Sequence, residues 1–298
     1  MILYYNNLHK RKNVNFFACI ALIYLCKKIR DLQKLPKSRQ ENISMPRFFV
    51  RKDQIADGVV AILGDDAHHI SRSLRMAAGE HITVCDMQKN EYYCVLEGFL
   101  PDRVLARIES EHKCDTEPPF TANLYQALPK GEKLDSVIQK SVECGVASIT
   151  TFMSERCIAK EKGTDENKLR RRQKIALEAA KQSGRGLVPE ISETVSFDTM
   201  LKGAAEADIK LFCYEGDDTA SIRQVLSAER ARLASDASLE GKLPVISVVI
   251  GSEGGFSLAE VGKARAAGLI PVGLGKRILR TETASGFVLG CLCYEFEL

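Results

Sequence analysis

The sequence predicts two units of different fold class, a small β-barrel followed by a larger α/β unit built on a mainly parallel sheet. Residues 45 to 112 form short segments rich in β-branched and aromatic residues, separated by glycine and aspartate turns, a pattern typical of strands. From residue 121 onward, strand-like and helix-like segments alternate, which indicates a parallel sheet with helices on both faces. We therefore expect units at 45–115 and 119–298, preceded by an N-terminal extension at 1–44.

The first unit is expected to contain several strands and one brief helix. Asp65 and Asp66 are predicted to cap that helix, which carries the apolar residues Ile70, Leu74 and Met76. A polar stretch at 113–119 ends in two prolines that cannot continue a helix or a central strand, so it is the expected linker. The strands are predicted to start within 45–50 and to continue at 59–63, 81–85, 92–99 and 103–109.

The second unit is expected to alternate strands with helices. Apolar residues at helical spacing predict a helix around Leu134 to Val142, and a longer helix is predicted at 166–183. Ser257 and Glu260 form a capping box that starts a further helix. The strands are predicted at 122–127, 147–152, 209–214, 245–250 and 270–273.

The basic charge of the chain is concentrated in its first 44 residues. They hold nine Lys/Arg and two acidic residues, whereas residues 45–298 hold 33 and 37. Bulk charge therefore does not indicate a nucleic-acid partner, and any basic surface must be local.

The ten cysteines are irregularly spaced without a CxxC pair, so we expect reduced thiols in a cytoplasmic protein. His68, His69 and His81 have no acidic or cysteine partners at ligand spacing, so they are expected to be structural and no metal is expected.

An apolar run at residues 14–26 follows a basic triplet and resembles a signal peptide or organellar address. The run is too short to span a bilayer, and no small-x-small cleavage site follows it before the next basic pair. The interpretation we favour is a physiological start at Met45. No membrane partner is expected.

Two loops of the α/β unit carry residues suited to ligand binding. In a parallel sheet, ligands bind beyond the carboxyl ends of the strands, where loops lead into helix N-termini. The predicted strand 245–250 runs into a turn at 251–255 with three glycines, which let the backbone approach a ligand closely. The loop at 273–284 contains Arg280-Thr281-Glu282-Thr283, in which either threonine is expected to cap the final helix. Arg280 and Glu282 could also form a simple exposed ion pair. Neither loop completes a P-loop or a dinucleotide fingerprint.

These loops resemble the corresponding segments of the RsmE family of ribosomal small-subunit RNA uracil-N3 methyltransferases, members of the SPOUT superfamily. The resemblance covers the chain from Met45 to its C-terminus. One departure is Ser252, where the family usually has proline, a change that can loosen the turn without removing a ligand contact. Four further segments match in the same order: Glu143-Cys144-Gly145, Ser154-Glu155-Arg156-Cys157, Gln182-Ser183-Gly184-Arg185 and Val188-Pro189-Glu190-Ile191.

The resemblance implies a PUA-like barrel, a SPOUT α/β domain with a deep trefoil knot, and a homodimer with each pocket near the subunit interface. It also implies S-adenosylmethionine as the cofactor and 16S ribosomal RNA of the small subunit as the substrate, with a role in rRNA processing and ribosome biogenesis. The implied cofactor-binding residues are Tyr214, Glu215, Ile250, Gly251, Glu253, Gly254, Leu274, Gly275, Leu279, Thr281 and Thr283.

Methylation of uracil N3 requires mainly the alignment of two substrates, but N3 is mostly protonated at neutral pH. We therefore hypothesise that Arg280 stabilises the developing anion, and that Glu282 orients Arg280 or takes the proton. The run of cations on the predicted helix 166–183 is by default a solvated face, although such a cluster can contact phosphates. The expected RNA-binding residues are Arg72, Arg75, Arg171, Arg172 and Arg185.

Two other interpretations stay open. The protein could be an RNA-binding ribosome assembly factor with the same fold and lapsed catalysis, although the intact segment 280–283 argues against this. It could also methylate a different RNA or a different atom. A nicotinamide-dependent Rossmann enzyme is disfavoured, because no glycine fingerprint opens the α/β unit.

Overall fold

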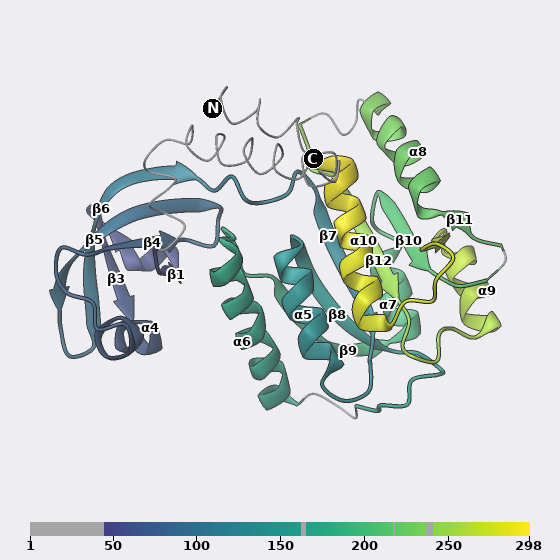
Figure 1. Cartoon of the computed structure of the whole chain (residues 1–298), viewed down its shortest axis with the longest axis horizontal. Coiled ribbons are helices and arrows are strands. Elements are labelled where there is room, and N and C mark those ends of the chain that lie inside the picture. The colour runs from purple at the N-terminus through teal and green to yellow at the C-terminus, as the bar shows by residue number, and fades with distance from the viewer. Residues whose placement is uncertain (1–44, 162–164, 217, 237–240) are drawn as a thin grey trace, which may run out of the picture. The chain divides into compact units, whose positions relative to one another are not determined.

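The computed structural model describes residues 45–161, 165–216, 218–236 and 241–298 (Figure 1). The extension at 1–44, with its apolar run and basic triplet, lies outside the described residues. Within the described ranges, no helix combines the length and the hydropathy that crossing a bilayer requires.

The first sheet has six strands in the order β1-β4-β5-β6-β3-β2. All neighbouring strands are antiparallel except β1 and β4, which are parallel. Asp57 and Gly58 form the turn between β2 and β3 with φ of 50° and 76°, the conformation that a two-residue type I′ hairpin requires. The elements are β1 (Arg47–Phe49), η1 (Lys52–Gln54), β2 (Ile55–Ala56), β3 (Val59–Leu63), α4 (Gly64–His68), η2 (His69–Ser73), β4 (His81–Cys85), β5 (Asn90–Phe99) and β6 (Arg103–Lys113).

The predicted strands of this sheet are confirmed, with β5 and β6 longer than expected. Residues Val60 and Ile62 of β3 are fully buried and their neighbours are not, so the alternation in the sequence marks the inner face. No ladder joins the outer strands β1 and β2 among the residues that the structure describes. Closure of this sheet into a barrel therefore stays a prediction.

The predicted cap of the short helix is wrong. α4 begins at Gly64 with Leu63 in the N-cap position and no side-chain cap, so Asp65 and Asp66 lie inside the first turn. There they still interact favourably with the helix dipole. The helix continues as a π-helical turn that ends at Ser73, and its buried residue is Ile70.

The second sheet has seven strands in the order β11-β13-β10-β12-β7-β8-β9, and every neighbouring pair is parallel. The carboxyl ends of these strands therefore lie along one edge. The elements are β7 (Thr121–Ala127), α5 (Lys133–Glu143), β8 (Val146–Met153), α6 (Glu166–Ser183), β9 (Glu190–Ser196), α7 (Phe197–Ala204), β10 (Ile209–Cys213), β11 (Ala220–Ser221), α8 (Ile222–Ser235), β12 (Val245–Ile250), α9 (Leu258–Ala266), β13 (Ile270–Gly273) and α10 (Thr281–Phe296).

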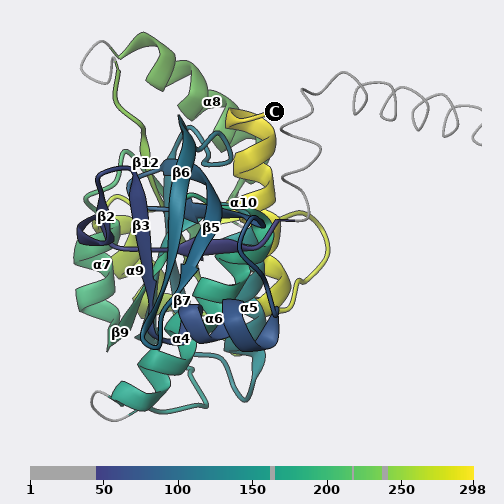
Figure 2. The ribbon, with the colours of Figure 1, turned by 90° about the vertical axis from the view of Figure 1, so that its left-hand side faces the viewer.

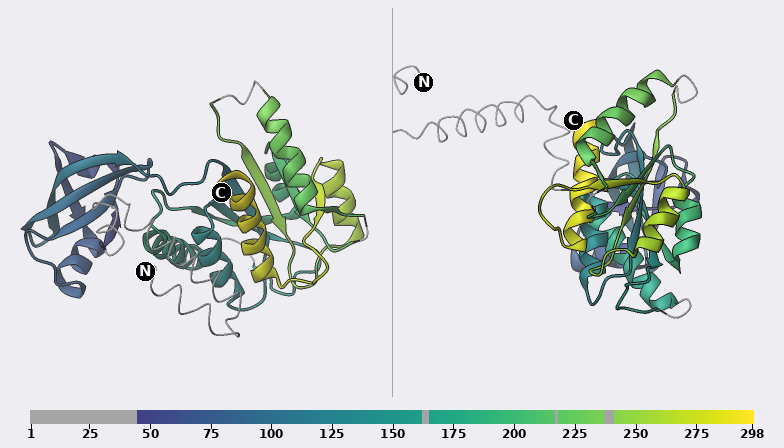
Figure 3. Two further views of the ribbon diagram at one scale, coloured as in Figure 1. Left: turned by 45° about the horizontal axis from the view of Figure 1, so that its top comes forward. Right: turned by 90° about the vertical axis from the view of Figure 1, so that its right-hand side faces the viewer.

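Helices cover both faces of this sheet, as the alternation predicts. Figure 2 shows α5, α6 and α10 on one side of the sheet and α7 and α9 on the other. The last helix, α10, packs against α5, α8, β7 and β12, and Figure 3 shows it alongside the sheet from two further directions. The capping box of Ser257 and Glu260 is confirmed, with both reciprocal hydrogen bonds present.

Each sheet has its own hydrophobic core. In the larger core, the ring of Phe256 lies 4.3 Å from that of Phe212 and is stacked with that of Phe152 at 6.4 Å between centroids. Phe256 directly follows the glycine turn at 251–255. The aromatic cluster therefore anchors that turn to the sheet, and such ring pairs stabilise beyond their buried area.

Candidate active site

The glycine turn and the start of α10 lie together at the carboxyl edge of the second sheet. The Thr281 hydroxyl donates a hydrogen bond to the carbonyl oxygen of Gly251 at 2.7 Å, and Thr281 is buried. The expectation that Thr281 or Thr283 caps the helix is wrong, because Arg280 occupies the N-cap position without a side-chain bond. The Thr281 hydroxyl is instead used to join the two loops.

Gln126, at the end of β7, completes this connection and was not predicted. Its side-chain amide nitrogen donates to the Thr281 hydroxyl at 2.8 Å and to the carbonyl of Ala127 at 2.9 Å. A longer contact of 3.4 Å reaches the Gly251 carbonyl. Gln126 is fully buried, and its Oε1 has no partner among the described residues. The available signal was a polar residue in register with the apolar residues Ala122 and Leu124, at alternate positions along the strand.

The segment from Ser154 to Cys157 packs directly against the glycine turn. Gly254 lies so close to it that an added Cβ would be 2.9 Å from the carbonyl oxygen of Arg156. The buried carboxylate of Glu260 accepts hydrogen bonds from the backbone N–H groups of Glu155 and Ser257, at 2.8 and 2.9 Å. The capping box therefore also holds this segment in place.

The remaining loops of the predicted pocket reach the same edge. Tyr214 and Glu215 follow β10, and the Tyr214 amide donates to the carbonyl of Val272 in β13. Leu274 and Gly275 follow β13, and Gly275 has a φ of +104° with open space where a Cβ would stand. A side chain at this position would be strained, so the loop presents its main chain. Ile250 is buried, Leu279 is half-buried and Thr283 is exposed.

The Glu253 carboxylate interacts with residues at the start of α5 and just before it. It accepts hydrogen bonds from the Lys133 ammonium at 2.6 Å and from the Lys130 amide at 3.2 Å. Although burial raises the pKa of the Glu253 carboxyl, hydrogen bonds from Lys133 and from backbone N–H groups outweigh that effect and lower the pKa below its ordinary value. The side chain of Glu253 therefore ties the glycine turn to the start of α5, and only its backbone is free to serve a ligand.

The two catalytic candidates differ in environment. Arg280 is exposed at the N-cap position of α10, and its guanidinium has no hydrogen-bond or ion-pair partner within the described ranges. Glu282 is half-buried, and its Oε2 is buried without a partner there. A simple Arg280–Glu282 ion pair is not formed. The Arg280 guanidinium is thus available to a substrate, whereas Glu282 Oε2 is an unpartnered acceptor inside the protein.

Two of the five predicted RNA-binding arginines, Arg172 and Arg185, are buried in ion pairs. Arg172 bonds to both oxygens of Glu161, at 2.7 and 3.2 Å, and Arg185 bonds to Glu117. Buried guanidinium groups with internal partners are not free for phosphate contacts. Arg72, Arg75 and Arg171 are exposed, and Arg171 pairs with Asp135.

This arrangement, with loops meeting at the carboxyl edge of a parallel sheet, is typical of the ligand sites of α/β enzymes. A family model described as RNA methyltransferase domain matches residues 116–293, which makes the protein an RNA methyltransferase.

The ribosomal RNA small subunit methyltransferase E of Bacillus subtilis is 33% identical over 85% of this chain and 98% of its own. That of Mesomycoplasma hyopneumoniae is 31% identical over 82% and 97%. The crystal structure of the Neisseria gonorrhoeae enzyme bound to S-adenosyl methionine superposes with a TM-score of 0.68 at 27% identity, covering 84% of this chain and 97% of that one. The chain belongs to the ribosomal RNA small subunit methyltransferase E family.

Proposed function

We propose that the protein methylates uracil N3 in 16S ribosomal RNA of the small subunit, with S-adenosylmethionine as the cofactor. The observation that carries this proposal is the joining of the glycine turn to the start of α10 through Thr281, Gly251 and Gln126. It creates one site from loops far apart in the sequence. A family relative carries S-adenosyl methionine in its structure, which supports the choice of cofactor.

The residues present fit such a cofactor. When bound, S-adenosylmethionine supplies an electrophilic methyl group on a sulfonium centre. The main chain at Gly251, Gly254 and Gly275 offers amide and carbonyl groups to a polar ligand, and the last two glycines are exposed. The buried Oε2 of Glu282 is an acceptor that has no partner among the described residues. Tyr214, Glu215, Ile250, Leu274, Leu279, Thr281 and Thr283 complete the proposed set.

In the proposed reaction, Arg280 faces the uracil and stabilises negative charge as N3 loses its proton. Glu282 lies two residues away and accepts that proton or orients Arg280. Most of the rate enhancement comes from holding the base and the methyl group in line. Arg72, Arg75 and Arg171 are exposed cations that contact RNA phosphates in this proposal.

We also propose that the protein acts as a homodimer through α10. Thr283, Phe287, Gly290 and Tyr294 are all exposed, and their spacing of four, three and four residues places them on one face of the helix. Phe287 and Tyr294 retain 40% and 74% of their accessible surface. Two exposed aromatic rings on one helix face, with a glycine between them, are typical of a helix that packs against a second copy.

The finer features of the fold belong to the same proposal. They are a PUA-like barrel at 45–115, a SPOUT domain at 119–298 with a trefoil knot, and a cytoplasmic location where ribosomal subunits assemble. Mixed α/β architecture with two sheets supports the first two.

Two measurements test the proposed function. Titration calorimetry is expected to show S-adenosylmethionine binding, and mass mapping of 16S ribosomal RNA from a deletion strain is expected to show loss of one methylated uracil. A protein that binds no cofactor would instead favour an assembly factor with lapsed catalysis. Loss of methylation on another RNA or at another atom would revise the substrate.

Gln126→Leu is expected to weaken cofactor binding by about tenfold. The leucine removes the donor to Thr281, and a buried hydrogen bond lost in this way costs ~1–3 kcal/mol, which corresponds to a factor of about ten or more in affinity. Calorimetry measures the effect. Asn123→Ala is the control, because Asn123 lies on the same strand but its amide oxygen accepts from Ser148. Equal affinities for the two variants would contradict the role of Gln126.

A further inference from the structure

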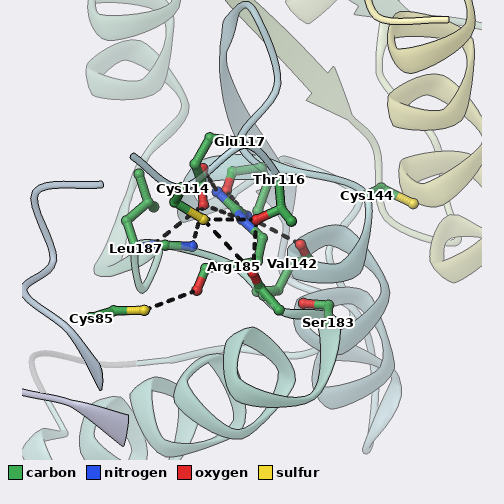
Figure 4. A network of polar contacts seen from close by, with 12 residues as sticks. Cys85, Cys114, Thr116, Glu117, Val142, Cys144, Ser183, Arg185 and Leu187 are labelled. Carbon is green, nitrogen blue, oxygen red and sulfur yellow. Dashed lines mark hydrogen bonds and ion pairs between the residues drawn. The ribbon is translucent and has the colours of Figure 1, made fainter. Parts of the chain in front are cut away.

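Residues 184 to 187, here called the junction loop, contact the first sheet and hold a buried ion pair with the connector between the two sheets (Figure 4). The Arg185 guanidinium donates to both oxygens of Glu117, at 3.1 and 2.8 Å. Its Nη1 also donates to the carbonyls of Val142 and Val146, at 3.1 and 2.6 Å. Arg185 is 3% exposed. Through these hydrogen bonds, its guanidinium joins the connector between the sheets to the α5–β8 turn.

The opposite side of the junction loop is held by the first sheet. The Arg185 carbonyl accepts a hydrogen bond from Nη1 of Arg47 in β1 at 3.3 Å, and the Cys85 thiol at the end of β4 lies 4.0 Å from it. Arg47 also bonds to both oxygens of Glu91 in β5, each at 3.1 Å. Two strands of the first sheet, β1 and β4, therefore reach this carbonyl group, and Glu91 of β5 holds the Arg47 side chain that donates to it.

Close packing makes this contact intolerant of added volume. A Cβ added at Gly186 would lie 2.6 Å from the Cβ and 2.8 Å from the Sγ of Cys114, which follows β6. Helix α6, just before the loop, adds an ion pair of 2.8 Å between Lys181 and Asp66. The Lys181 ammonium also lies 5.5 Å from the centre of the Phe48 ring.

We propose that the junction loop fixes the position of the first sheet relative to the active site, and that Arg185 and Arg47 are positioning residues for the RNA substrate. Buried ion pairs hold one geometry rather than adding much stability. An RNA that contacts both sheets is presented to Arg280 only when their relative position is fixed. This inference rests on the proposed function, in which the first sheet contacts RNA.

Gly186→Ala tests the inference, because it adds one methyl group at the junction and changes no charge. The variant is expected to raise KM for unmethylated small ribosomal subunits by about tenfold or more, since small misplacements of a substrate are costly. Its Kd for S-adenosylmethionine is expected to stay within about twofold of the unchanged protein, because the pocket lies elsewhere. Gly262→Ala is the matched control, since Gly262 on α9 has open space around it.

A second substitution separates positioning from loss of folding. Cys114→Gly removes both atoms that the added methyl group would meet, so the double variant G186A/C114G is expected to recover the low KM. A role in stability alone would lower the folded fraction, and cofactor-binding capacity and kcat would then fall together. Unchanged KM in Gly186→Ala, or no recovery in the double variant, overturns the inference. If the unchanged protein methylates no RNA, the proposed function itself fails instead.

Discussion

Arg280→Ala is expected to lower kcat for RNA methylation by about a hundred- to a thousandfold, the usual effect of removing one group that stabilises a developing oxyanion. Arg280 suits this role because it is exposed at the start of α10 and has no internal partner among the described residues. Cofactor affinity is expected to change little, since Thr281 and not Arg280 joins the two loops. Single-turnover methylation and calorimetry measure the two quantities separately.

Arg277→Ala is the control for this experiment. Arg277 is exposed on the same loop, so its removal changes the local charge without touching the helix start. Its kcat is expected to stay near that of the unchanged protein. Equal losses of kcat and cofactor affinity in Arg280→Ala would place Arg280 in the cofactor pocket and contradict its proposed role at the uracil.

Arg185→Met is expected to lower the free energy of unfolding by about 3–5 kcal/mol, the usual cost of breaking a buried ion pair by removing one partner. Glu117 would keep a buried charge, and the carbonyls of Val142 and Val146 would lose their donor. Urea denaturation followed by circular dichroism measures the change.

Two further variants make this stability prediction specific. Arg171→Met breaks the exposed pair with Asp135, and it is expected to cost less than about 1 kcal/mol. The double variant R185M/E117L removes both charges and is expected to recover part of the loss. Recovery is partial because Glu117 also accepts from the amides of Gly186 and Leu187. If Arg185→Met lowered the free energy of unfolding by less than Arg171→Met does, the structural importance of the buried ion pair would be contradicted.

Local patterns predicted most of the fold. The bounds of β3, β4, α6, β12 and β13 agree with the sequence-based expectation, because alternation, helical spacing and turn residues all act within a few positions. β9 and α7 were not predicted. Glu190–Ser196 has only one fully buried residue, and its polar composition hides a strand at the edge of the sheet.

The sequence could not reveal which distant groups meet. Arg171 and Arg172 are neighbours in one basic run, yet one is exposed and the other is buried against Glu161. A strand reveals its own buried face but not the loop that will lie beyond its end, so Gln126 was missed. The resemblance to a known family brought the 251–255 and 280–283 segments together in the prediction, and the structure joins them through Thr281.

The pairing of strands β7 and β12 in the second sheet affects how the protein folds during translation. Val245 of β12 pairs with Thr121 of β7, and the last helix packs against both strands. The N-terminus of a nascent chain leaves the ribosome first. Because β12 lies late in the chain, it can pair with β7 only near the end of translation. Contacts between distant segments slow folding and leave apolar strands exposed in the meantime. A protein that methylates ribosomal RNA thus becomes active only after a ribosome has nearly finished making it.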